Sequence, residues 1–175
     1  MNIFATSFSP RQAAYDLPDK LVVKMILETA QLLCTAHRVL DGTDTLEGQE
    51  LYKETHKNHP CAVWVRESRD NYFWAYDHFV ALCNAYTYRY GKVHATDAKF
   101  REVLWTAPKQ ASYSGLTPPP ACMPDEFKVE DQGSWPTASY RKYLALGKSY
   151  MADLGKAYRI PTEIPYWAKS LQHEA

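Results

Sequence analysis

The sequence contains little glycine and none of the glycine-rich motifs that bind nucleotides. Glycine occupies 7 of the 175 positions, and the patterns GxxxxGKS/T, GxGxxG and GxSxG do not occur. A P-loop NTPase, a dinucleotide-dependent oxidoreductase and an α/β-hydrolase are therefore not expected.

The sequence also lacks an excess of one charge and a long apolar segment. Its 20 Lys and Arg balance 20 Asp and Glu, so only a local cluster of cations would point to a nucleic acid. No run reaches the roughly 18 apolar residues of a membrane span, and the N-terminal MNIFATSFSPRQ has neither the basic nor the apolar region of a signal peptide. We expect a soluble, cytoplasmic protein with no membrane partner.

Cysteine and histidine form no recognisable metal motif. The four cysteines are far apart without a CxxC pair and are expected to be reduced, mostly buried thiols: Cys34, Cys61, Cys83 and Cys122. His56 and His59 are three residues apart in THKNHPC, but no further ligand follows at a metal-binding spacing. HEXXH and the deaminase pattern HxE…PCxxC are also absent. We therefore expect no metal and no cofactor.

The THKNHPC segment has two other interpretations. Its histidines and Asn58 suit contacts with a phosphate or a base edge. They equally suit a structural loop that caps the following helix, which Pro60 is expected to begin because the N–H that proline lacks has no partner there. Both interpretations stay open at this point.

The hydrophobic pattern predicts a single, mainly α-helical domain over residues 1–175, with about four to five helices and little or no sheet. The expected segments are an extended arm or short strand over 1–8, a turn-rich stretch over 9–18, a helix over 19–40, a long helix over about 60–90 with a break near 68–71, a short helix capped by Thr96, a long Pro-rich connection over 106–136, a last helix over 138–158 capped by Thr137, and an aromatic tail over 160–167.

One face of the 19–40 helix carries a row of polar side chains. Lys20, Lys24, Glu28 and Gln31 recur every three or four residues, which places them on one stripe. A Lys–Glu pair of this kind is typical of a solvated helix face, where it contributes about 0.3–0.5 kcal/mol. Alternatively, lysines hold Glu28 ionised at a cleft, as a general base or a stabiliser of a cationic sugar requires.

Aromatic and basic residues alternate in WVRESRDNYFWAYDHF. This composition suits single-stranded or flipped nucleotides, because every base offers a stacking face and every nucleotide a phosphate. Aromatic residues at helical spacing are also typical of a helix core. The candidates for nucleic-acid contact are Arg66, Arg69, Asn71, Tyr72 and Trp74, together with Arg89 and Lys92 of YRYGK.

The MNIF start, LPDK and DKLVVKMILE resemble the N-terminal arm and first helix of the phage pyrimidine-dimer DNA glycosylase/AP lyase family. This likeness covers about a fifth of the chain. A second and stronger likeness, to a group of uncharacterised phage proteins, covers nearly the whole chain through DKxVVKMILETAQ, YKxTHKNHPC, WxRES, NYxW and YRYGK. A phage-encoded protein would act in the host cytoplasm.

The glycosylase resemblance implies an all-helical fold and a mechanism. The α-amine of Asn2, exposed by removal of Met1, would attack the sugar of a damaged nucleotide, and Glu28 would stabilise the cationic sugar and assist β-elimination. The remaining roles would be phosphate contacts for Lys20, Lys24, Arg66 and Arg69, and accommodation of a flipped base by Tyr72, Trp74 and residues 106–136. The sequence departs from the family at Leu21, where the family has His, and at Asn2, where it has a small hydroxyl residue.

Two further functions stay open from the sequence. The first is a transferase or hydrolase that acts on a modified base or nucleotide with Glu28, His56 and His59, without an imine. The second is a non-catalytic module that binds DNA or a host protein through its aromatic surface. The lead hypothesis is the glycosylase/lyase, with DNA or a nucleotide as the binding partner.

Overall fold

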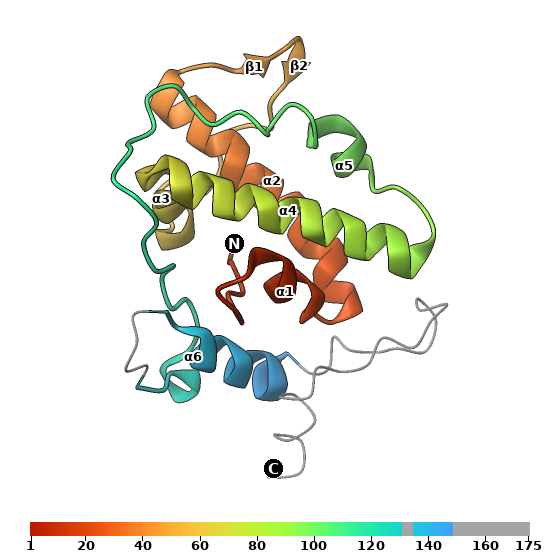
Figure 1. Ribbon diagram of the computed structural model, residues 1–175, viewed down its shortest axis with the longest axis vertical. Coiled ribbons are helices and arrows are strands. Elements are labelled where there is room, and N and C mark those ends of the chain that lie inside the picture. The colour runs from red at the N-terminus through yellow and green to blue at the C-terminus, as the bar shows by residue number, and fades with distance from the viewer. Residues whose placement is uncertain (131–134, 149–175) are drawn as a thin grey trace.

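The protein is described by a computed structural model that places residues 1–130 and 135–148 (Figure 1). Within these residues the elements are α1 (Pro10–Tyr15), α2 (Asp19–Asp41), β1 (Thr45–Leu46), β2 (Gln49–Glu50), α3 (Pro60–Glu67), α4 (Arg69–Tyr90), α5 (Ala95–Phe100), the 3-10 helix η1 (Asp125–Phe127), α6 (Thr137–Lys142) and the π-helical turn η2 (Tyr143–Gly147). The predicted mainly α-helical class is confirmed. The one sheet in this part of the chain is the antiparallel pair β1–β2.

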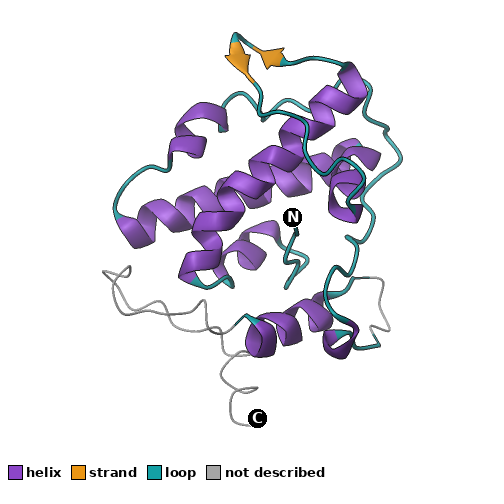
Figure 2. Ribbon diagram, turned by 180° about the vertical axis from the view of Figure 1, so that it is seen from behind, coloured by secondary structure: helices purple, strands orange, loops and turns teal. Residues whose placement is uncertain are grey.

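The two long helices, α2 and α4, cross and form the centre of the fold (Figure 2). Each ends at a glycine with a positive φ, Gly42 at 65° and Gly91 at 70°, which is a common way for a helix to stop because glycine adopts this conformation without strain. Their facing sides contribute fully buried apolar side chains to the core, including Leu33, Phe79 and Leu82.

The predicted break in the 60–90 helix is confirmed at Ser68, which separates α3 from α4. Its backbone is extended, with φ −150° and ψ 161°, and its hydroxyl accepts a hydrogen bond from the N–H of Asn71. His59 caps α3 and Pro60 takes its first position, as one interpretation of THKNHPC predicted.

Two local predictions between residues 9 and 100 were wrong. Residues 9–18 were expected to be turn-rich, yet they contain α1, which begins where the Ser9 hydroxyl accepts the N–H of Gln12. The short helix α5 is capped by His94, whose ring nitrogen accepts the N–H of Thr96, so Thr96 lies inside the helix and does not cap it. In both helices the side chain at the cap position supplies the acceptor that the helix start needs: Ser9 for α1 and His94 for α5.

The N-terminal arm, residues 1–9, is irregular, with bends at residues 6–9, and lies in the middle of the molecule, between the α2–α4 layer and α6 (Figure 1). Ile3, Phe4 and Ala5 are buried. The Phe4 ring contacts the rings of Tyr140 and Tyr143, with centroid separations of 6.1 and 6.0 Å. The prediction of an arm docked on the core is thereby confirmed.

The later parts of the chain agree with the sequence as far as they are described, except for the cap of α6. Residues 106–130 are irregular apart from η1, as expected for the long Pro-rich connection. Thr137 is the first residue of α6 and follows Pro136 at the cap position, so Thr137 is not the cap. Residues 149–158 of the predicted last helix and the predicted tail at 160–167 lie outside the described residues. No helix in the described ranges is long and apolar enough to cross a membrane.

Candidate active site at the N-terminal arm

A cavity of about 390 Å³ opens where the start of the chain meets α2, α3 and the segment after Cys122. Its lining residues are Met1, Asn2, Phe4, Leu21, Lys24, Met25, Glu28, His59, Cys122, Met123, Pro124, Tyr143 and Lys148. It combines an amine, a carboxylate, an imidazole and a thiol, which are the groups that carry nucleophilic and acid–base chemistry.

The Glu28 carboxylate lies next to two positively charged groups in this cavity. One carboxylate oxygen lies 3.6 Å from the α-amine of Met1, and the other lies 3.8 Å from the Lys24 ammonium group. The Glu28 side chain is 19% exposed, whereas that of Lys24 is 61% exposed. Glu28 therefore faces a partly enclosed cavity beside the chain start, and the interpretation of its row as a wholly solvated face does not hold at this position.

The arm is fixed beside Glu28 by the side chain of Asn2. Its amide nitrogen donates to the carbonyl oxygen of Cys122 at 2.7 Å. Its amide oxygen accepts the N–H of Ile3 at 2.7 Å and the hydroxyl of Tyr140 at 3.0 Å. The amine next to Glu28 is therefore that of Met1, and the side chain of the predicted nucleophile Asn2 acts as an anchor.

His59 belongs to the cavity, but His56 is not among the residues that line it. The His59 ring nitrogen Nδ1 accepts the N–H of Cys61 at 3.1 Å at the start of α3. Burial lowers the pKa of His59, and the positive chain terminus lowers it further, so the ring is held neutral. His56 is exposed, has a positive φ of 47°, and its ring contacts the Thr55 hydroxyl at 2.7 Å.

Cys61 and Cys122 belong to the site and were not selected from the sequence. Their sulfur atoms are 3.8 Å apart, with the Cys61 thiol donating to Cys122. That hydrogen bond, with help from Lys128 and the chain terminus, lowers the pKa of Cys122 to about 7. The same bond and burial raise the pKa of Cys61. The Pro-Cys of THKNHPC hinted at Cys61, but nothing in the sequence links it to Cys122.

Several predicted nucleic-acid contacts are accessible. Lys20, Lys24, Asn58 and Lys92 are exposed, and Gln31 is half-buried on the same stripe of α2 as Glu28. Lys24 is the member of this group that lines the cavity.

Four of the other predicted contacts are corrected by the structure, because their side chains are buried and bonded within the protein. They are Asn71, Tyr72, Trp74 and Arg89. Tyr72 donates its hydroxyl to the Leu104 carbonyl, and Arg89 donates to the Leu17 carbonyl. These side chains hold the fold together and offer no surface to a nucleotide. The core interpretation of the aromatic residues is the one that the structure supports.

Arg66 and Arg69 are half-buried and also engaged in the fold. The Arg66 guanidinium donates to the Lys57 carbonyl at 2.6 Å. The Arg69 guanidinium lies between the rings of Phe73 and Tyr113, 5.3 and 5.0 Å from their centroids. Neither arginine lines the cavity at the chain start.

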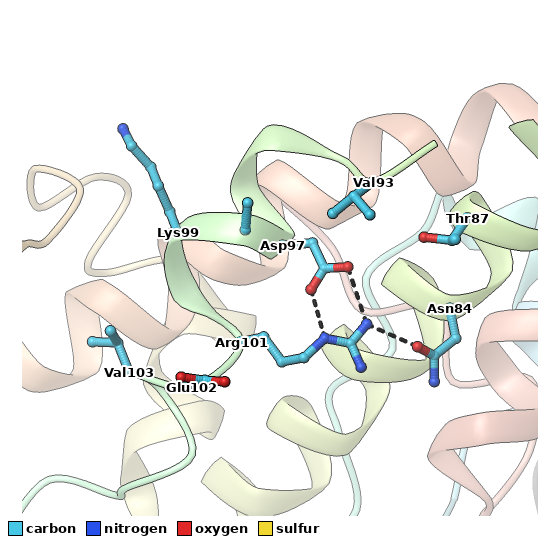
Figure 3. Close-up of a pocket in the computed structure, with 9 residues that line it drawn as sticks. Asn84, Thr87, Val93, Asp97, Lys99, Arg101, Glu102 and Val103 are labelled. Atoms are coloured by element: carbon cyan, nitrogen blue, oxygen red, sulfur yellow. Dashed lines mark hydrogen bonds and ion pairs between the residues drawn. The ribbon is translucent and has the colours of Figure 1, made fainter. Parts of the chain in front are cut away.

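A larger cavity of about 580 Å³ lies between α4 and α5, on a different part of the molecule (Figure 3). Its central cation, Arg101, donates to Asp97 at 2.6 Å and to Asn84 at 2.8 Å. Because the strongest charges in this cavity neutralise each other and it contains neither thiol nor imidazole, the smaller cavity at the chain start is the better candidate for chemistry.

Comparison with known proteins found no matching family model, curated protein or solved structure.

Proposed function

We propose that this protein is a DNA glycosylase with AP lyase activity, acting on damaged pyrimidines through the α-amine of the chain and Glu28. The observation that carries this proposal is the 3.6 Å separation of the Met1 amine and the Glu28 carboxylate in a cavity of about 390 Å³. Ligand cavities of a few hundred Å³ suit small molecules, and a single nucleotide turned out of a duplex is of that class.

In the proposed reaction the amine, after losing a proton to solvent, attacks C1′ of the damaged nucleotide. The bond from C1′ to the base breaks, the base leaves with the electron pair and gains a proton, and the amine nitrogen becomes bonded to C1′. The C1′–O4′ bond of the sugar then opens, O4′ takes its electron pair and gains a proton, and the nitrogen and C1′ form an iminium ion. Glu28 stabilises the positive charge that develops on the sugar. It then accepts a proton from C2′, and the electrons of that C–H bond expel the 3′ phosphate, which cleaves the strand.

The position of the amine supports Met1 as the nucleophile of a chain that begins there. The α-amine of Asn2, exposed by removal of Met1, was the expected nucleophile, but with Met1 present that nitrogen is part of a peptide bond, and the Asn2 side chain anchors the arm to Cys122 and Tyr140. Reacting groups need to approach to about 3–3.5 Å. The Met1 amine is already at the carboxylate, whereas removal of Met1 would leave the new amine one residue further along the arm.

Cations at the cavity support a substrate with phosphate groups. Lys24 and Lys148 line the cavity, and Lys20 is exposed one turn before Lys24 on α2. Phosphate contacts of this kind position a nucleic acid without reading its sequence. The damaged base would then be selected by its tendency to leave the stack.

His59 favours a second candidate function. It lines the same cavity as Glu28. A transferase or hydrolase acting on a modified base or a nucleotide would use the two side chains for acid–base catalysis without an imine. His56, the other histidine of that hypothesis, is exposed and does not line the cavity.

Borohydride trapping on duplexes that contain an abasic site or a cyclobutane pyrimidine dimer separates the two functions. We expect a covalent protein–DNA adduct whose modified peptide contains Met1, because borohydride reduces the imine to a stable amine. We expect Glu28→Gln to reduce strand cleavage by about 100-fold or more while DNA binding is kept, since a general acid–base residue contributes about 10²–10⁴-fold.

Glu54→Gln is the matched control, because Glu54 is an exposed carboxylate paired with Lys57 outside the cavity. This variant should cleave like the unmodified chain. A chain extended by one glycine before Met1 should form no adduct. Trapping through Lys24 would contradict the role of the Met1 amine, and cleavage that continues without any adduct would contradict the imine mechanism.

A further inference from the structure

Three side chains with metal-binding atoms meet beside the cavity. His59 caps α3, Cys61 is the second residue of α3, and Cys122 comes from the Pro-rich connection 61 residues later. One ligand atom from each lies within 4.8 Å of the other two. Among the described residues this is the one group of at least three such side chains that meets the geometric condition.

The two sulfur atoms already have the separation that a tetrahedral metal imposes. They are 3.8 Å apart. Two thiolates bound to one Zn²⁺ at about 2.3 Å, with a tetrahedral angle between them, are separated by about 3.8 Å. A disulfide needs sulfur atoms about 2.05 Å apart, so the observed distance fits a shared metal without the approach that a disulfide requires.

The backbone holds the ligands in place. The N–H of Cys122 donates to the Tyr140 hydroxyl at 3.2 Å, and its carbonyl accepts the Asn2 amide at 2.7 Å. Both polar groups of its backbone are therefore fixed, and its sulfur points to Cys61. Cys61 is fully buried at the first turn of α3.

The donor atoms of the three groups also suit a cation. Cys61 and Cys122 already share one proton between sulfur atoms that lie 3.8 Å apart. The metal would replace the proton that Cys61 donates to Cys122, and two thiolates would neutralise a dication. Nδ1 of His59 presents a lone pair, because it accepts the Cys61 N–H. Moving that lone pair to a metal costs one helix-cap hydrogen bond.

We infer that His59, Cys61 and Cys122 bind one Zn²⁺ ion, with the fourth coordination position open to the cavity that contains Met1 and Glu28. Two thiolates and an imidazole are soft ligands, which favour zinc over magnesium or calcium. Three protein ligands with one open position is the arrangement of catalytic zinc sites, whereas structural sites use four. His59 and Cys122 line the cavity, so the open position would face it.

This inference is independent of the proposed imine chemistry, which uses none of the three ligands. A zinc-bound water beside Glu28 would instead support the hydrolytic candidate, because the metal makes water a better nucleophile and a carboxylate can accept its proton. The expectation of no metal came from spacing along the chain, which does not bring Cys122 next to His59 and Cys61.

Metal binding is tested with the full chain, purified under reducing conditions, stripped with a chelator and titrated with Zn²⁺ or Co²⁺. We expect one equivalent of either ion per chain. The Co²⁺ form should show the intense visible bands of a tetrahedral site and a thiolate charge-transfer band. Cys122→Ser should weaken Zn²⁺ binding by at least about 100-fold, since even the outer partners of metal ligands contribute about 10–100-fold.

His59→Asn provides a second variant that keeps the fold, because asparagine caps helices well but removes the imidazole. It should lose the tetrahedral Co²⁺ spectrum while retaining the circular dichroism of the unmodified protein. His56→Asn and Cys83→Ser are the controls, and both should bind one Zn²⁺. A Co²⁺ spectrum without thiolate bands, equal Zn²⁺ affinity in Cys122→Ser, or a protein isolated with a Cys61–Cys122 disulfide and no metal would overturn the inference.

Discussion

At the scale of single residues, Lys24 and Glu28 show how a common helix pair can have two different environments. They form an i,i+4 ion pair at 3.8 Å, but Lys24 is 61% exposed and Glu28 only 19%. The exposed partner contributes little to stability, because exposed pairs are worth about 0.2–1 kcal/mol. The Lys24 ammonium group is accessible to a second anion from solvent, whereas the Glu28 carboxylate is mostly enclosed by the cavity.

We therefore predict that Lys24→Met weakens DNA binding with little effect on stability. One phosphate contact fewer should lower the slope of log K against log salt concentration by about 0.9. The slope is measured with a fluorescent duplex at several salt concentrations, and stability by urea unfolding. Lys99→Met, at an exposed position on α5, should leave the slope unchanged. An equal slope in Lys24→Met would remove Lys24 from the proposed interface.

At the scale of elements, α1 and α4 are joined by a buried histidine. His78 on α4 donates from Nδ1 to the Pro10 carbonyl at 2.9 Å and stacks on Trp74 at 5.3 Å between centroids. Burial lowers the pKa of His78 from 6.5 to about 4. The folded state therefore holds His78 neutral at a pH where the unfolded chain has already gained a proton.

The sign of the pH dependence follows from this difference. Above pH 6.5 His78 is neutral in both states and its titration does not affect stability, whereas the free energy of unfolding decreases as the pH falls from 6.5 towards 4, because the unfolded chain gains a proton first. The decrease amounts to roughly 3.5 kcal/mol at most, at about 1.4 kcal/mol per pKa unit. Urea unfolding of the unmodified chain and of His78→Gln at pH 7 and pH 4.5 measures it. Glutamine can still donate to Pro10 but does not titrate.

His78→Gln should therefore lose less stability on acidification than the unmodified chain. Some loss should remain, because burial also lowers the pKa of His37. Equal losses in the two proteins would show that His78 does not titrate in this range.

The helices that could be predicted are those whose signals are local and strong. The apolar period of 19–40, the glycine at 91 and the Ser68 break are each contained within a few residues of the element they define. The helix α1 was missed because six residues carry too little of a period to distinguish a helix from a turn. Its stability comes from packing against α4, which no local pattern shows.

The same limit separates the site residues that could be predicted from those that could not. Helical spacing predicted Glu28 and Lys24 on one stripe, and the family resemblance placed the chain start beside it. Cys122 and Tyr140 could not be predicted there, because they contact Asn2 from 120 and 138 residues away. The aromatic run misled for a related reason. Burial, which the sequence does not reveal, turned Tyr72 and Trp74 from candidate platforms into core.

At the scale of the whole molecule, the N-terminal arm connects α6 to the helices α1 and α4. The Thr6 hydroxyl donates to Asp16 at 2.7 Å, and the Phe8 carbonyl accepts the Trp74 indole at 2.9 Å, which ties the arm to α1 and α4. On its other side Arg141 donates to the Thr6 carbonyl at 2.8 Å. The described part of α6 is thus attached to the long helices largely through the arm, which also delivers the amine to Glu28.

Phe4 is the apolar centre of that attachment, because its ring is buried against Tyr140 and Tyr143. We predict that Phe4→Ala destabilises the protein by about 3–5 kcal/mol, the usual cost of emptying a buried aromatic site. The loss should appear first as faster hydrogen exchange in residues 137–148, while α2 and α4 keep their protection, because α6 loses its main apolar contact with the arm.

Phe8→Ala is the matched control, since Phe8 is 64% exposed and its replacement should cost much less stability. Uniformly faster exchange across α2, α4 and α6 would instead show that the arm, α6 and the long helices unfold as one unit. In that case the contact of the arm with α6 would not open separately.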